Sequence, residues 1–151
     1  MATHKNPLML KALEILLRCG DENYKRMAKD VELNQLVNLA KAGEYQDVQR
    51  LQSIIIKYRP SYSSSRDVCY LQLNESLRFC HNQYFVALKA LQYIAQQTDH
   101  PNRYEVAKAL YNNGEKDGEK ALREISQQLN HPNQKEASEI LSWMNWICSV
   151  S

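Results

Sequence analysis

Glycine, proline and threonine are all scarce in this chain. Its 151 residues include four glycines, four prolines and only two threonines. Threonine favours strands, whereas almost every glycine or proline lies where a helix is expected to begin or end. Between these positions apolar residues recur at intervals of three and four, which is the spacing of one helix face. The sequence thus predicts an all-α fold, a compact stack of seven to eight antiparallel helices arranged as an αα-hairpin array or an irregular bundle.

The chain also lacks a strong charge of either sign and any long apolar run. Nineteen basic and seventeen acidic residues give a formal net charge of +2, and neither half of the chain is strongly basic. Binding of a phosphate backbone by bulk charge is therefore not expected, and nucleic acid is not predicted as a partner. The most apolar segment, Leu8–Leu17, contains Lys11 and Glu14. We expect neither a membrane span nor a targeting segment there.

The length fits one domain, so a single helical domain is predicted over residues 1–151. Serines cluster at 61–66, where we expect a flexible loop between two helical halves. With no targeting segment expected, the chain is predicted to be soluble and cytoplasmic. Secretion without a cleavable signal peptide is the alternative.

The four cysteines do not form a metal-binding or redox motif. They are Cys19, Cys69, Cys80 and Cys148, and no two of them have the C-x-x-C spacing. Each lies in or beside an apolar helical pattern, so we expect buried or half-buried reduced thiols. No cofactor and no metal ion is predicted from the sequence.

The positions of glycine, proline and asparagine predict where the helices lie. Asn6-Pro7 begins a first helix that Gly20 ends, and this helix is apolar over most of its circumference, so we expect it at the centre of the fold. A heptad-like series over 67–97 predicts one long helix, or two helices with a break near His81-Asn82. The break is favoured because Asn82 can cap a helix. The other predicted helices are Glu32–Ala42, which Gly43 ends, Glu44–Tyr58, Arg103–Asn113, which Gly114 ends, Gly118–Leu129 and Asn133–Cys148.

One weak internal repeat is visible. His100-Pro101-Asn102 and His131-Pro132-Asn133 are 31 residues apart, both begin predicted helices, and Leu110 matches Leu141. This period is close to that of ankyrin and tetratricopeptide units, but the defining patterns of those families are absent. The spacing is typical of stacked helical hairpins, and chance similarity of two helices that begin at proline is the alternative.

Two histidine motifs have the residue types needed for chemistry, but each has a simpler structural interpretation. His100 and His131 have no Asp, Glu or Cys at ligand spacing, so each is expected to cap or flank a helix. Cys80-His81 pairs a nucleophile with a base, but consecutive helix residues point about 100° apart. We therefore expect Cys80 in the core and His81 in solvent.

The C-terminal helix is the most informative segment. Its core face is expected to consist of Ala137, Ile140, Leu141, Met144, Ile147 and Cys148. Trp143 lies at the border of that face, and Trp146 lies roughly 170° from its centre, beside Lys135 and Glu139. Either the helix is covered on both sides, or Trp143 and Trp146 contribute to a contact surface, where tryptophan is enriched. Trp143, Trp146, Glu139 and Lys135 are therefore the candidate partner-binding residues.

These features predict a non-catalytic protein-interaction module that binds another protein or a second copy of itself. An adaptor, a chaperone-like cofactor or an inhibitor would fit. One alternative is a secreted bacterial effector that binds a host protein, because the chain is helical and has twelve asparagines and twelve glutamines. The other is an unrecognised cysteine-dependent enzyme, in which Cys80 or Cys69 would have to meet a histidine in space.

Overall fold

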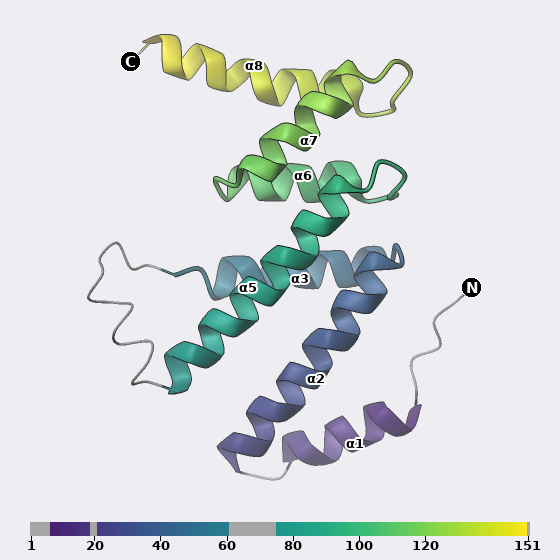
Figure 1. The fold of residues 1–151 in the computed structure, drawn as a ribbon, viewed down its shortest axis with the longest axis vertical. Helices are drawn as coiled ribbons and strands as arrows, with labels where there is room; N and C mark the ends of the chain where they lie inside the picture. Colours follow the sequence, from purple (N-terminus) through teal and green to yellow (C-terminus); the bar gives the residue numbers. More distant parts are fainter. Residues whose placement is uncertain (1–6, 19–20, 61–74, 151) are drawn as a thin grey trace. The chain divides into compact units, whose positions relative to one another are not determined.

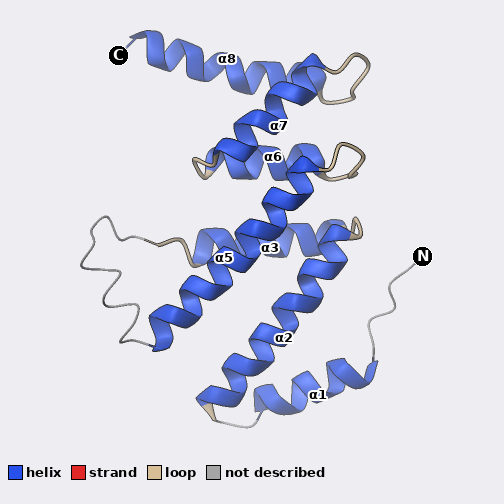
Figure 2. Ribbon diagram, in the orientation of Figure 1, coloured by secondary structure: helices blue, strands red, loops and turns tan. Residues whose placement is uncertain are grey.

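The computed structural model describes residues 7–18, 21–60 and 75–150, and their regular structure is entirely helical (Figures 1 and 2). Within the helices, the side chains of residues 16, 17, 144, 145 and 148 are not described. Seven helices and no strand occur in these three segments, and the predicted all-α class of antiparallel helices is confirmed. The helices are α1 (Pro7–Arg18), α2 (Glu22–Lys41), α3 (Tyr45–Lys57), α5 (Glu75–Gln96), α6 (Arg103–Asn112), α7 (Lys116–Gln127) and α8 (Gln134–Val150).

The chain divides into two compact units, residues 1–90 and 91–151, and α5 passes from one unit to the other. In the first unit α1 packs on α2 and α2 packs on α3. In the second unit α6 packs on α7 and α7 packs on α8. The single domain expected over 1–151 stays a prediction.

Burial in the first unit follows the period of the helix. The buried apolar side chains of α2, α3 and α5 include Leu33, Leu36, Leu39, Val48, Leu51, Ile55, Tyr84, Ala87 and Leu88. Their spacing of three and four residues places them along one stripe of each helix. The buried Gln83 of α5 donates from its side-chain amide to Asp30 Oδ1 of α2 over 2.8 Å. This hydrogen bond offsets the cost of removing the amide from water.

The second unit buries a cation at the start of α6. Arg103 is only 3% exposed, and its Nε donates to the backbone oxygen of Ala95 over 2.8 Å. Its guanidinium also pairs with Glu124 of α7. A buried guanidinium needs such partners, because an unpaired charge inside a protein is strongly destabilising. The apolar core of this unit includes Leu91, Ile94, Val106, Ala107, Leu110, Ala121, Leu122, Ile125 and Ala137.

Two helix pairs are joined by the same glycine turn. Gly43 follows α2 with a φ of +103°, and Gly114 follows α6 with a φ of +82°. The N–H of each glycine donates to the carbonyl three residues earlier, and the N–H of the next residue donates to the carbonyl five residues earlier, over 2.9–3.1 Å. This is the Schellman arrangement, which satisfies the last carbonyls of a helix and favours glycine because φ is positive. The prediction that these two glycines end helices is confirmed.

The turns at His100 and His131 also share one geometry. In each turn the histidine Nδ1 accepts a hydrogen bond from the backbone N–H of the asparagine two residues later, over 3.1 Å. The first residue of the following helix donates a side-chain N–H to the carbonyl eight residues earlier, from Arg103 in one turn and from Gln134 in the other. The expected flanking role of both histidines is confirmed. The same turn therefore occurs at both His-Pro-Asn motifs, so the 31-residue repeat is present in the structure as well as in the sequence.

The prediction that the first helix lies at the centre of the fold is wrong. Leu8, Met9, Leu10 and Ile15 are exposed, and Leu13 is the one buried residue among the described side chains of α1. The physical reason is that α1 packs on one neighbour, α2, which can cover only one face. An apolar circumference permits burial on several sides, but neighbouring helices must be present to provide it.

Two other boundaries differ from the prediction. Helix α5 runs without interruption through His81-Asn82, so the favoured break is wrong. Asn82 is exposed, where a polar residue belongs on a continuous amphipathic helix. Helix α2 begins at Glu22, ten residues before the expected start, because Asp21 accepts from the Asn23 N–H over 2.8 Å and caps it. The remaining predicted helices agree to within two residues at each end, and the predicted loop at 61–66 lies outside the described residues.

The two glycines of the α6–α7 hairpin should respond in opposite ways to alanine and asparagine. At Gly114 a Cβ would meet nothing within 4 Å, but φ is positive, so asparagine should be tolerated better than alanine. At Gly118 a Cβ would lie 2.3 Å from the Tyr111 backbone nitrogen, so Gly118→Ala should cost about 1–3 kcal/mol and Gly118→Asn more. Urea unfolding followed by circular dichroism measures all four variants. The same order of Ala and Asn at both positions would contradict this explanation.

Candidate functional site

Helix α8 is attached to its unit through its first half. Gln134 donates from its side-chain amide to the Ser126 carbonyl over 3.2 Å, Ala137 is fully buried, and Ile140 and Leu141 are half-buried. These side chains have the spacing of one helix face, and α8 packs on α7. Figure 1 shows the second half of α8 extending beyond α7. The first half therefore anchors the helix, and the second half presents side chains to solvent.

Carboxylates at the start of α8 also act on α6. Burial raises the pKa of Tyr104, and the negative charges of Glu105, Glu136 and Glu139 raise it further, while Lys108 lowers it. Lys108 Nζ lies 5.2 Å from the centre of the Tyr104 ring. Both carboxylates of α8 therefore lie near enough to α6 to affect its tyrosine electrostatically.

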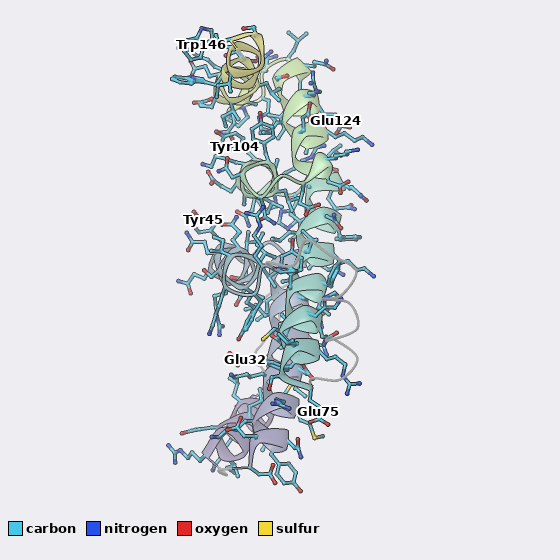
Figure 3. All side chains as sticks on the ribbon, turned by 90° about the vertical axis from the view of Figure 1, so that its left-hand side faces the viewer. Glu32, Tyr45, Glu75, Tyr104, Glu124 and Trp146 are labelled. Carbon is cyan, nitrogen blue, oxygen red and sulfur yellow. The ribbon has the colours of Figure 1, made fainter. Side chains whose placement is uncertain are left out.

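All four predicted partner-binding residues lie on the exposed side of α8. Lys135 Nζ and Glu139 Oε1 are 4.0 Å apart, one turn from each other. Trp143 is 66% exposed and Trp146 is 63% exposed. The two rings meet edge to face, with centroids 6.4 Å apart and an interplanar angle of 74°. Figure 3 shows the Trp146 side chain pointing away from the helices of its unit.

Two further apolar side chains extend this surface. Ile147 is 53% exposed and Val150 is also exposed, so the expected place of Ile147 in the core face is wrong. Positions 143, 146, 147 and 150 follow the i, i+3, i+4, i+7 spacing of one helix stripe. We call Trp143, Trp146, Ile147 and Val150 the tryptophan face, with the Lys135–Glu139 pair at its N-terminal edge. This spacing is visible in the sequence, and it could have predicted that Ile147 and Val150 share a face with the two tryptophans.

The length of α8 explains why Ile147 is exposed. Under the 31-residue repeat, α8 corresponds to α6, which ends at Asn112 before the Gly114 turn. The position that matches Gly114 is residue 145, an asparagine, and α8 continues through it to Val150. The 17-residue α8 is therefore longer than the 10-residue α6, and its additional turns carry most of the tryptophan face.

The tryptophan face includes a hollow that suits an apolar group. Ser142, Trp143 and Trp146 line it. Ser142 Oγ donates to the Glu139 carbonyl over 2.8 Å, so its hydroxyl is already bonded to the helix backbone. Among the described side chains, the two indole rings supply the rest of the lining. The hollow can therefore receive an aliphatic or aromatic side chain by burial and by ring contacts.

The other candidate residues do not come together in a site. His81 packs its ring against Phe85, with centroids 4.3 Å apart. Cys80 and His81 are both half-buried, so the expectation of Cys80 in the core and His81 in solvent is wrong: both lie at the border of the buried stripe of α5. Cys69 lies outside the described residues. Within the described part of the chain no group of three or more His, Cys, Asp or Glu side chains could hold a metal ion, and no helix there is long and apolar enough to cross a membrane. The expectation that the chain is not an enzyme stays a prediction.

The exposure of the tryptophan face can be measured directly, because Trp143 and Trp146 are the only tryptophans in the sequence. In dilute solution the emission should lie close to that of free tryptophan in water, since most of each ring contacts solvent. Acrylamide should quench it efficiently. Trp143→Phe and Trp146→Phe, measured separately, assign the emission to each ring. A blue-shifted emission that resists quenching would show that the rings are covered.

Comparison with known proteins assigns no family to this chain. No family model matches it, no curated protein matches it, and no solved structure matches it. Its function must therefore be inferred from the side chains that it exposes, above all from the two tryptophans of α8.

Proposed function

We propose that this protein is a protein-interaction module and that the tryptophan face of α8 is its docking surface. The observation that carries this proposal is the exposure of both tryptophans on a helix whose first half is packed against its own unit. Trp143, Trp146, Ile147 and Val150 form one continuous stripe, which is the pattern of an amphipathic helix that meets a second apolar surface.

The exposed area is large enough to drive binding. A tryptophan side chain buries roughly 150–250 Å² when it is covered. At about 25 cal/mol per Å², covering the exposed two thirds of each ring is worth about 3 kcal/mol before the entropic costs of association. Tryptophan is also enriched among the few residues that contribute most of the energy at interfaces. A partner that covers both rings would therefore gain most of its affinity from them.

The charges of α8 favour a protein over a lipid surface or a nucleic acid. Helices that lie on membranes are rich in lysine and arginine on their polar side. Between Gln134 and Val150 the sequence of α8 contains one lysine and two glutamates. Stacking of tryptophan on nucleic acid bases would likewise be accompanied by a basic groove. An apolar stripe with an acidic edge fits an apolar protein surface with basic side chains beside it.

The double variant Trp143→Ala/Trp146→Ala should lose partners and keep its fold. Each truncation is expected to weaken binding roughly 30-fold, the effect of removing about 2 kcal/mol at a hot spot. The free energy of unfolding should change by no more than about 0.5 kcal/mol, because both rings are exposed. Affinity capture from native lysate, quantified by mass spectrometry and followed by titration of the purified partner, measures the first effect. Circular dichroism during urea unfolding measures the second.

Leu129→Ala is the matched control. Leu129 is 83% exposed and lies in the same unit, outside α8, so its truncation removes an exposed apolar side chain without touching the tryptophan face. The control should capture the same partners as the unchanged chain. Equal capture by the double variant, or unfolding of the double variant, would show that the tryptophans do not form a docking surface.

A further inference from the structure

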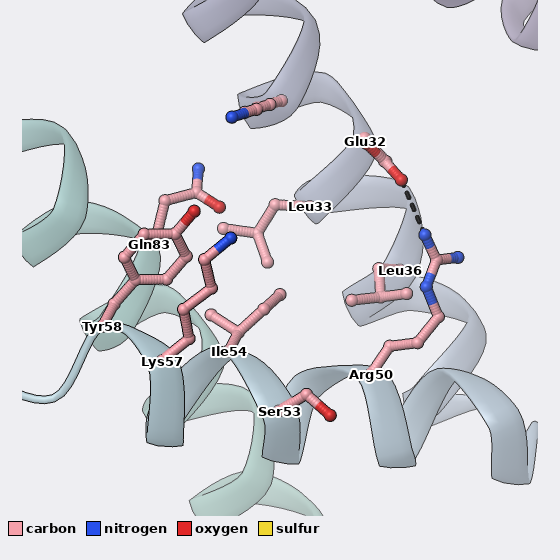
Figure 4. Close-up of a pocket in the computed structure, with 10 residues that line it drawn as sticks. Glu32, Leu33, Leu36, Arg50, Ser53, Ile54, Lys57, Tyr58 and Gln83 are labelled. Carbon is pink, nitrogen blue, oxygen red and sulfur yellow. Dashed lines mark hydrogen bonds and ion pairs between the residues drawn. The ribbon is translucent and has the colours of Figure 1, made fainter.

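A second surface, in the first unit, is hollowed between α2 and α3 (Figure 4). Its apolar floor includes the buried Leu33 and Leu36 of α2 and the half-buried Ile54 of α3. The volume is about 280 Å³. This is close to the lower end of the range for small-molecule sites, so the hollow suits one large side chain. We call it the α2–α3 groove.

The rim of the groove is basic. Lys29, Arg50 and Lys57 line it, together with the carboxylate of Glu32. Arg50 donates to Glu32 over 2.7 Å and also lies 3.7 Å from Asp47, so two carboxylates balance its charge. Lys29 Nζ lies 5.7 Å from the centre of the Phe79 ring, and Lys57 Nζ lies 5.2 Å from the centre of the Tyr58 ring. The two lysines therefore have defined positions and place two ammonium groups beside the apolar floor.

The tryptophan face has the opposite character. Its centre is a pair of indole rings, and the first turns of α8 beside it carry Glu136 and Glu139 against Lys135. An apolar anchor flanked by excess carboxylate is the complement of an apolar floor flanked by excess ammonium. The hollow has room for one indole ring, and a helix lying across it would bring its next turn against the rim.

We propose that the occupant of the α2–α3 groove is helix α8 of a second copy of this chain. This inference rests on the proposed function and names its partner. One of the two indole rings is buried on Leu33, Leu36 and Ile54, and the carboxylates of Glu136 and Glu139 face Lys29 and Lys57. Because the groove and the tryptophan face are different surfaces, the contact is heterologous, and each copy can donate one helix and accept another.

Three variants separate the two surfaces. Trp143→Ala/Trp146→Ala removes the face and keeps the groove. Lys29→Glu/Lys57→Glu reverses the rim and keeps the face, and both lysines are exposed, so the fold should survive. Lys116→Glu/Lys120→Glu is the control, because it makes the same change in net charge at two exposed lysines of α7. Circular dichroism verifies the helix content of each variant.

Sedimentation velocity from about 1 to about 100 μM, the range of weak specific contacts, measures association. The unchanged chain and the control should increase in mass with concentration, and their tryptophan emission should shift to the blue over the same range. The face variant and the rim variant should each stay monomeric. An equimolar mixture of these two variants should form a one-to-one dimer and nothing larger. The face variant contributes only an intact groove, and the rim variant contributes only an intact face.

Several results would overturn this inference. A monomeric unchanged chain at the highest concentration would do so, and so would association that the rim reversal leaves intact, which indicates a face-to-face contact. Failure of the mixture to dimerise, or a blue-shifted emission in the monomer, would also exclude a second copy as the occupant. If the chain stays monomeric but the tryptophan variant loses lysate partners, the proposed function stands and only this inference fails.

Discussion

Short helices depend on their neighbours for stability, and this dependence shapes both units. Helices α6 and α7 contain 10 and 12 residues, lengths at which an isolated helix is marginal in water. Each must therefore bury its apolar stripe against the next helix at once. The Schellman turn at Gly114 reverses the chain within a few residues, and Gly118 lets the backbone of α7 approach that of α6 where no side chain would fit. Close backbone approach beside a tight turn thus helps to stabilise the α6–α7 hairpin.

The same dependence explains which features could be predicted from the sequence. Turn residues act locally, so Gly43, Gly114 and the two His-Pro-Asn motifs predicted helix ends to within two residues. The central position of α1 was wrong, because an apolar circumference describes one helix and says nothing about how many neighbours surround it. At the site, the helical wheel placed Trp146 opposite the core but assigned Ile147 to it. Whether Ile147 is covered depends on how far α7 extends, which periodicity cannot reveal.

Helix α8 differs from the shorter helices α6 and α7, because only its first half buries its apolar stripe against a neighbouring helix. It keeps the anchoring turn of its repeat, with Gln134 bonded to Ser126 as Arg103 is bonded to Ala95. It lacks the glycine at the position where α6 ends, so the helix continues and exposes a second apolar stripe. An ordinary surface helix would place polar residues on those turns. The retained anchor and the apolar extension together give a helix that is held at one end and exposes an apolar stripe at the other, as the proposed docking surface requires.

The proposed contact joins two surfaces that are already ordered before they meet. Binding costs free energy for every side chain that must be immobilised, and this cost falls when the side chains are held in place beforehand. Trp143 and Trp146 already rest edge to face against each other, and each has only two side-chain torsions. Lys29 and Lys57 lie over aromatic rings at the groove. Because little order has to be created on either side, less of the free energy gained by covering an indole ring is lost to immobilisation than at a looser surface.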